Sequence, residues 1–277
     1  DLNGKINGES TLTHANGDVF TGILQDGKRE GRGKVVYANG DLYEGQFHKD
    51  RRHGNGTFLA ADGYRYSGSW QNGKISGRGE VRYPDGSVYV GAFVDDLPEG
   101  IGKITYPDGS TYEGNWKAGI IDGAGKATYP NGLVYEGSFK NAQNHGYGIM
   151  TFADSYRYEG NWKDGKRHGA GQARYRDGTT YVGGFVEGQR SGEGYIKMTD
   201  GFSYTGEWLE GEIHGKGTAT YANGDVYTGS FVNGRRQGKG TMRYATGGVA
   251  SGTWENGVLQ PAETTAPAPD AAASPSE

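Results

Sequence analysis

The fold is decided by residues 112–134, which contain Tyr112-Glu-Gly-Asn-Trp116, Gly123-Ala-Gly125 and Asn131-Gly132. In the first segment aromatic or small residues alternate with polar residues, and this period of two predicts a β-strand. The second segment alternates in the same way and predicts a partner strand. Between the two strands we expect a Gly-bearing loop of about six residues. The Asn-Gly pair predicts a turn into the next strand.

This 23-residue stretch is repeated along the chain. With Tyr112 as position 1, an equivalent aromatic residue recurs every 23 residues from Phe20 to Tyr227, with no insertion or deletion. Each repeat is one hairpin that contacts only its neighbours. We therefore predict an all-β fold, an elongated single-layer antiparallel sheet of tandem 23-residue β-hairpin repeats over residues 1–259. The predicted divisions are a half repeat at 1–19, ten full repeats at 20–249 and a half repeat at 250–259.

The composition agrees with this pattern. The chain has 277 residues, including 53 Gly, 20 Tyr, 9 Phe, 5 Trp and no Cys. Each Gly in a helix interior costs about 1 kcal/mol relative to Ala, so glycines spread along the whole chain exclude a mainly helical fold. Of these glycines, 51 fall at repeat positions 3, 8, 12, 14 and 21. We interpret them as gaps over which rings at positions 1, 5 and 18 lie flat, because Gly has no Cβ to obstruct a ring.

The connection between successive repeats has a clear turn signature. Tyr83-Pro84-Asp85-Gly86 places Pro at the second residue of a type I turn and Gly at the left-handed residue after it. This predicts a three-residue hairpin loop with a G1 bulge. Such a loop pairs position 16 with the next position 1, and position 14 with the next position 3, so that aromatic residues and glycines share one face. Four departures weaken single hairpins: Ser155 at the turn Gly, Ala60 and Met198 at position 18, and Ala250 at position 1.

Charge and the chain ends limit the function classes. The formal net charge is -4 and the pI is near 5.9, so the chain has no overall attraction to nucleic acid or to an anionic membrane. Residues 260–277 form a Pro/Ala-rich tail that we predict to be disordered and acidic. The chain opens at Asp1 rather than Met, which raises the expectation that an upstream segment such as an export signal was removed.

The residues that carry chemistry follow the repeat. His53, His145, His168 and His214 all occupy position 11, so neighbouring copies should lie roughly 10 Å apart and cannot share one metal ion. We interpret them as solvated loop residues. The only denser cluster, His48, His53 and Asp50, has no recognisable ligand spacing. The Gly-rich residues 27–33 precede no helix, unlike a phosphate-binding loop. We therefore predict no catalytic residues, no metal site and no cofactor.

Tyr-x-Gly-x-Trp/Phe, Gly-x-Gly and Asp-Gly-x-x-Tyr at a period of 23 resemble the MORN (membrane occupation and recognition nexus) repeat, over residues 1–259. The resemblance implies a ribbon of hairpins curved like a half-pipe, and a binding or scaffolding role. It also implies protein partners, self-association, and in some members membranes or phospholipids. Catalysis in such families lies in separate domains, and none is expected within residues 1–277. The sequence names neither the partner nor the compartment.

We predict a non-enzymatic scaffold that binds protein partners along the aromatic and glycine face. Many rings on one face of a thin sheet should leave an exposed apolar strip, which usually marks an interaction surface. The competing interpretation is that the rings cover the glycines and one another, with nothing left over. The candidate partner-binding residues are Trp70, Trp116, Trp162, Trp208, Phe93, Phe139 and Phe185.

The alternative function is a peripheral membrane or anionic-phospholipid tether. Basic residues cluster at positions 9 and 10, and they would line one long edge if the loops project together. The competing interpretation is that they are solvated turn residues. The candidate lipid-contact residues are Lys28, Arg29, Arg51, Arg52, Lys166, Arg167, Arg190, Arg235 and Arg236. Two unpaired terminal strands, or the aromatic face, are candidates for self-association.

Overall fold

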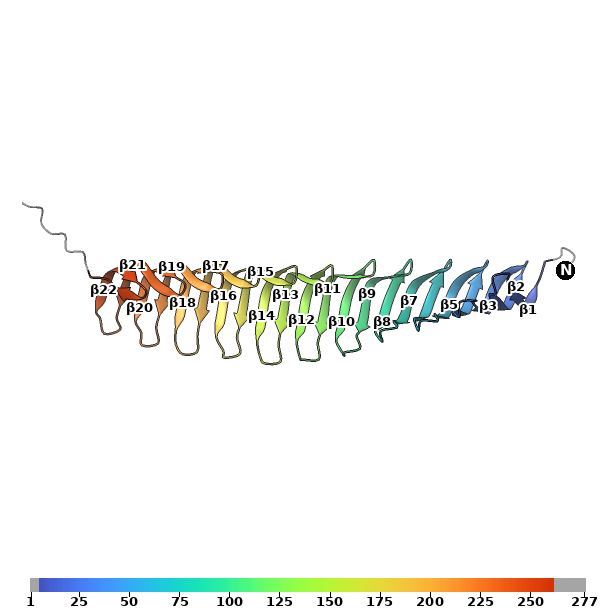
Figure 1. The fold of residues 1–277 in the computed structure, drawn as a ribbon, viewed down its shortest axis with the longest axis horizontal. Helices are drawn as coiled ribbons and strands as arrows, with labels where there is room; N and C mark the ends of the chain where they lie inside the picture. Colours follow the sequence, from blue (N-terminus) through green and yellow to red (C-terminus); the bar gives the residue numbers. More distant parts are fainter. Residues whose placement is uncertain (1–4, 262–277) are drawn as a thin grey trace, which may run out of the picture. The chain divides into compact units, whose positions relative to one another are not determined.

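The computed structural model describes residues 5–261, and Figure 1 shows their fold. Within these residues every regular element is a β-strand, which confirms the predicted all-β array of antiparallel hairpins. None of the described residues forms a helix able to cross a membrane. The chain divides into two compact units, residues 1–176 and 177–277. All but the first two residues of the predicted tail, 262–277, lie outside the described residues.

In unit 1, each described strand pairs antiparallel with the strand before it in the chain. Its strands are β1 (Gly8–Thr13), β2 (Val19–Gln25), β3 (Lys28–Val36), β4 (Leu42–His48), β5 (Arg51–Leu59), β6 (Arg65–Gln71), β7 (Lys74–Arg82), β8 (Val88–Val94), β9 (Leu97–Thr105), β10 (Thr111–Lys117), β11 (Ile120–Thr128), β12 (Val134–Lys140), β13 (Gln143–Thr151), β14 (Arg157–Lys163) and β15 (Lys166–Arg174).

Unit 2 is built in the same way from consecutive antiparallel strands. Its strands are β16 (Thr180–Val186), β17 (Gln189–Lys197), β18 (Ser203–Leu209), β19 (Glu212–Thr220), β20 (Val226–Val232), β21 (Arg235–Arg243), β22 (Val249–Glu255) and β23 (Val258–Leu259).

The connection within each repeat is tighter than predicted. β14 ends at Lys163 and β15 begins at Lys166, so only Asp164 and Gly165 form the turn, with φ of 48° and 80°. Two consecutive residues with positive φ are typical of a type I′ turn, whose twist matches that of antiparallel strands. The predicted six-residue loop is wrong because position 6 belongs to the first strand and positions 9 to 11 extend the second strand. The position-11 histidines therefore lie in strands, not in loops.

The connection between repeats has the predicted geometry. The Tyr106 N–H donates to the Ser110 carbonyl at 2.9 Å, and the Gly109 N–H donates to the Tyr106 carbonyl at 2.9 Å. Gly109 has a φ of 86°, as the left-handed residue of a G1 bulge requires. The register follows: Gly125 pairs with Gly137, and Ala127 with Tyr135. The predicted three-residue loop and its pairing are confirmed.

The core of each unit lies on one face of its sheet, where rings cover glycines. The ring of Tyr89 is fully buried, and a Cβ placed on Gly102 would lie 2.2 Å from the Tyr89 hydroxyl oxygen. That hydroxyl donates to the Ala92 carbonyl at 3.0 Å. The same contact between a position-1 ring and the glycines at positions 3 and 14 recurs along the chain, as predicted. These glycines are needed because their missing Cβ gives the ring its place.

The rings also contact one another in an unbroken series within each unit. Tyr89 meets Phe93 of its own repeat at 5.1 Å and Trp116 of the next repeat at 5.0 Å, both edge-to-face. The Trp116 indole N–H donates to the Gly102 carbonyl at 3.2 Å. Unit 2 repeats the pattern, with Tyr181 between Phe185 and Trp208. Each position-1 tyrosine is thus held by rings from two repeats, which couples neighbouring hairpins.

Candidate partner-binding surface

The seven predicted partner-binding rings are all buried. Their exposed fractions run from 1% for Phe185 to 8% for Trp116. The predicted exposure of these rings is wrong, because position-1 tyrosines pack edge-on against them and, in the four tryptophans, glycine carbonyls accept the indole N–H. That they anchor a partner stays a prediction. The buried rings are Trp70, Trp116, Trp162, Trp208, Phe93, Phe139 and Phe185.

The nine predicted lipid-contact residues divide into two rows. Arg52 represents position 10: its guanidinium lies 4.2 Å from the ring centroid of Trp70 and donates to the Gly73 carbonyl at 3.2 Å. The arginines at position 10, namely Arg29, Arg52, Arg167, Arg190 and Arg236, all lie half-buried over aromatic rings. The cations at position 9, namely Lys28, Arg51, Lys166 and Arg235, are exposed. The nine therefore do not form one solvated edge, and a lipid contact stays a prediction.

The position-11 histidines do not meet. Within residues 5–261, no three His, Asp or Glu side chains come together in a way that could hold a metal ion. Each of the four histidines has a buried Nδ1 with no hydrogen-bond partner. Their positions follow from the repeat, since each lies on the second strand of a different hairpin. These histidines are His53, His145, His168 and His214.

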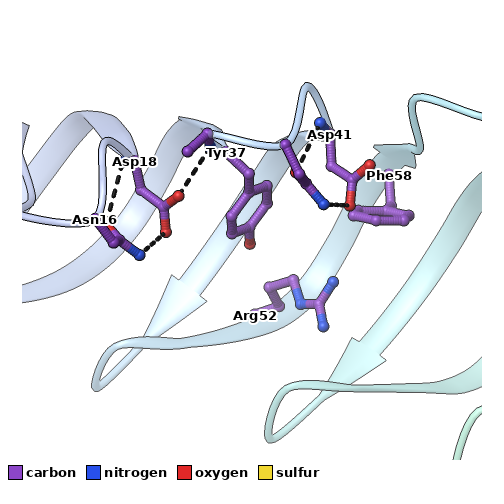
Figure 2. Close-up of a pocket in the computed structure, with 8 residues that line it drawn as sticks. Asn16, Asp18, Tyr37, Asp41, Arg52 and Phe58 are labelled. Atoms are coloured by element: carbon purple, nitrogen blue, oxygen red, sulfur yellow. Dashed lines mark hydrogen bonds between the residues drawn. The ribbon is translucent and has the colours of Figure 1, made fainter.

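A pocket of about 450 Å³ opens in unit 1 beside the turns that connect repeats, and Figure 2 shows its lining. The ring of Tyr37 lies between two successive turns, one carrying Asp18 and the other Asp41, and it extends toward Arg52. Phe58 lines the same pocket. Three successive hairpins therefore contribute to this pocket, which combines aromatic surface, one guanidinium and two carboxylates.

The carboxylates in this pocket are tied to the turns. One oxygen of Asp18 accepts the Ala38 N–H at 3.0 Å and the other accepts the Asn16 amide at 2.9 Å. These hydrogen bonds hold the pKa of the Asp18 carboxyl below its usual range. Asp41 makes the same bridge to Ala61, at 3.0 Å. Both carboxylates therefore link one turn to the next at the rim of the pocket.

Unit 2 contains an equivalent pocket of about 480 Å³, in which Phe202 and Met242 take the places of Asp18 and Phe58. Its turn, Tyr221-Ala-Asn-Gly-Asp225, has the same sequence as Tyr37-Ala-Asn-Gly-Asp41. Arg236 stands 15 residues after Tyr221, as Arg52 does after Tyr37. The sequence pattern does not indicate this pocket, because the ring at position 18 follows the same alternation as the rings that cover glycines. The signal that would have found it is the fixed spacing between the position-18 tyrosine and the next position-10 arginine.

Position 18 differs from positions 1 and 5 in burial. Tyr106 is 37% exposed and Tyr129 is 44% exposed, whereas Tyr112 at position 1 is 2% exposed. Desolvation is still enough to raise the pKa of Tyr106 above its ordinary value. The rings left at the surface of this face therefore form a row beside the turns between repeats.

Comparison with known proteins agrees with the repeat. The family model described as "MORN repeat" matches ten segments, namely residues 20–42, 43–63, 66–88, 89–111, 112–134, 135–155, 158–180, 181–202, 204–226 and 227–249. No curated protein matches the sequence.

Two solved structures with a similar chain path come from the zebrafish Danio rerio. The TCP10 domain of CPAP in complex with a peptide of STIL is 12% identical, with a TM-score of 0.44, and the match covers 89% of this chain and 100% of that one. The same domain alone is 14% identical, with a TM-score of 0.36, and the match covers 88% and 100%. At these scores the likeness supports no inference about function.

Proposed function

This chain belongs to the MORN repeat family, and from that premise we propose that it is a non-enzymatic scaffold that binds protein partners. The observation that carries the proposal is the row of part-exposed position-18 rings, on a face where the rings at positions 1 and 5 are buried. Aromatic side chains that the core does not need, and that line up at a surface, are typical of protein-binding sites. The proposed absence of catalysis rests on the repeat, which accounts for the placement of the histidines and glycines.

The proposal is tested by measuring binding affinities directly. The purified chain is first used to capture proteins from an extract of its native cells. Each captured protein is then produced separately, and its affinity for the wild-type chain is measured. The double variant Tyr106→Ala, Tyr129→Ala should weaken binding at least about tenfold, because each buried aromatic contact at an interface contributes about 2 kcal/mol. The fold should survive, because Ala60 already occupies position 18 in one repeat.

A matched control variant distinguishes loss of the binding surface from loss of fold stability. Tyr147 and Tyr195 are 54% and 40% exposed, and their positions, 13 and 15, point to the face opposite the ring core. The variant Tyr147→Ala, Tyr195→Ala removes the same chemistry from that face and should leave binding unchanged. Equal losses in both double variants, or no loss in either, would contradict the proposed surface.

The buried tryptophans need a gentler substitution. From Phe47 to Trp254, position 5 alternates between Phe and Trp, so Trp116→Phe places in one repeat the ring that its neighbours Phe93 and Phe139 already carry. If a partner contacts the indole, this variant weakens binding while the fold is retained. Unchanged affinity would remove Trp116 from the partner-binding set.

A further inference from the structure

Three consecutive repeats of unit 1 carry the same Tyr-Pro turn, at Tyr83, Tyr106 and Tyr129. Adjacent turns are close: a Cβ placed on Gly86 would lie 3.5 Å from Cγ of Pro107. Tyr83 is half-buried, and the other two rings are more than a third exposed. The three tyrosines therefore form a ladder of part-exposed rings at equal steps, which we call the Tyr-Pro ladder.

The step of this ladder is set by the sheet. Each repeat contributes two strands spaced by about 4.8 Å, so equivalent rings lie about 9.6 Å apart. A polyproline II helix advances about 3.1 Å per residue with three residues per turn, so every third residue returns to the same side after about 9.3 Å. The mismatch of about 0.3 Å per repeat accumulates to only about 0.6 Å over three rings.

Other regular peptide conformations fit the same step less well. An extended strand covers about 9.9 Å in three residues, but residues three apart point to opposite sides. An α-helix returns to nearly the same side after seven residues, which cover about 10.5 Å, so its mismatch of about 0.9 Å per repeat accumulates to about 1.8 Å over three rings. Among these regular forms, the polyproline II helix matches the spacing of three successive tyrosines best.

The residues that take the place of Arg52 beside the ladder are uncharged. Arg52 stands 15 residues after Tyr37, and the residues at that spacing after the ladder tyrosines are Pro98, Ile121 and Asn144. Pro98 is buried and Ile121 is half-buried, so they add apolar surface where the pockets described above have a guanidinium. This combination of rings and uncharged residues suits proline side chains.

The segment around the ladder carries a net negative charge. Residues 83–129 contain seven Asp and Glu, three Lys and no Arg, a net charge of -4. Asp85 and Asp108 lie in the turns of the ladder itself. Hydrogen bonds from Ser110 hold the pKa of the Asp108 carboxyl below its usual range, so the carboxylate is charged at neutral pH. The ligand that complements this rim is positively charged.

We propose that the Tyr-Pro ladder binds a proline-rich segment of a partner protein that carries flanking Arg or Lys and adopts the polyproline II conformation. The prolines lie against Tyr83, Tyr106 and Tyr129, and the basic residues face Asp85 and Asp108. A polyproline II backbone has no internal hydrogen bonds, so its carbonyls are free to accept from the phenol hydroxyls. This inference rests on the proposed scaffold function and names the class of partner.

The test uses the full chain and fluorescence anisotropy with synthetic labelled peptides. The main probe has nine consecutive prolines between two pairs of arginines, since nine residues span about 28 Å, close to three repeats. One comparison peptide keeps the arginines and replaces the prolines with alternating Gly and Ser, and another keeps the prolines and replaces the arginines with Glu. We expect the main probe to bind at least tenfold more tightly than either. Tyr106→Ala, Tyr129→Ala should weaken it at least tenfold, and Tyr106→Phe, Tyr129→Phe should restore most of the affinity.

Three outcomes would overturn the inference: equal binding of the Gly-Ser peptide, which would indicate charge attraction alone; no binding of the main probe; or unchanged binding to the Tyr106→Ala, Tyr129→Ala variant. Tyr147→Ala, Tyr195→Ala serves as the matched control and should bind the probe within twofold of wild type. The broader proposal is judged separately: if the probe fails while a recovered partner still loses affinity for the Tyr106→Ala, Tyr129→Ala variant, the scaffold function stands and the proline-rich ligand is rejected.

Discussion

A single methyl group placed under one tyrosine tests the physical basis of the fold. In Gly102→Ala the new Cβ would lie 2.2 Å, 2.5 Å and 2.6 Å from Oη, Cζ and Cε2 of Tyr89. All three nearest atoms belong to that one ring, and no backbone atom is among them. The Tyr89 ring must therefore move. The change in the free energy of unfolding of this variant measures what the contacts of the ring contribute to stability.

The loss can be estimated from the contacts of Tyr89. Its hydroxyl hydrogen bond to the Ala92 carbonyl contributes about 1 kcal/mol. Its two edge-to-face contacts, with Phe93 and Trp116, contribute about 1 kcal/mol each. We expect Gly102→Ala to lower the free energy of unfolding of the surrounding repeats by about 3 kcal/mol.

A double-mutant cycle isolates the contact between methyl group and ring. Denaturant unfolding, followed by circular dichroism, is measured for Gly102→Ala, Tyr89→Ala and the double variant. In the absence of the ring the added methyl group should cost little, so the coupling energy should be about 3 kcal/mol. Gly248→Ala is the control, because its φ is ordinary and its nearest neighbour is at 3.4 Å. A coupling energy below about 0.5 kcal/mol would refute the account of rings seated on glycine.

Three further results are expected. Ser155 has a φ of 73° at a turn position that is otherwise Gly in the full repeats. Ser155→Gly should therefore raise the free energy of unfolding, measured with denaturant, by about 1 kcal/mol. No gain would mean that the Ser155 turn carries no strain. Arg52→Gln removes a stacked, hydrogen-bonded guanidinium and should lower the free energy of unfolding by about 1–2 kcal/mol. Arg51 is exposed, so Arg51→Gln should lower it by less than about 0.5 kcal/mol. Equal losses in the two variants would contradict the division into two rows. Burial raises the pKa of Tyr135 to about 12 from the ordinary 10.0, so between these two pH values the folded chain keeps a proton that the unfolded chain loses. The free energy of unfolding from Tyr135 should therefore be fully present below pH 10 and fall between pH 10 and 12, as measured by thermal unfolding at each pH. A flat pH profile would show that such tyrosines are solvated.

Much of the fold could be predicted because its rules are local and copied. The Pro-Asp-Gly turn at residues 84–86 fixes a three-residue loop, and the loop fixes the register by parity. The loop within the repeat was predicted too long, because Gly165 and its preceding Asp were counted with residues that continue the strand. Sequence spacing alone does not separate a long loop from a type I′ turn followed by a longer strand.

The candidate site was harder to predict, because burial depends on side chains from adjacent hairpins. Trp116 and Tyr106 are both aromatic and both on the ring face, yet only Tyr106 is left part-exposed. Trp116 is covered by Tyr89 from the preceding repeat and Tyr112 from its own. The row of basic residues divided for the same reason, since Arg52 reaches a ring of the next repeat.

The sequence by itself determined the repeat length, the strand pairing and the need for glycine under each position-1 ring, because each follows from alternation, turn chemistry and the absence of a Cβ within one or two hairpins. Only the tertiary structure decided which rings and cations remain at the surface. That outcome depends on where neighbouring repeats place their side chains, and the twist and spacing of the sheet set those positions.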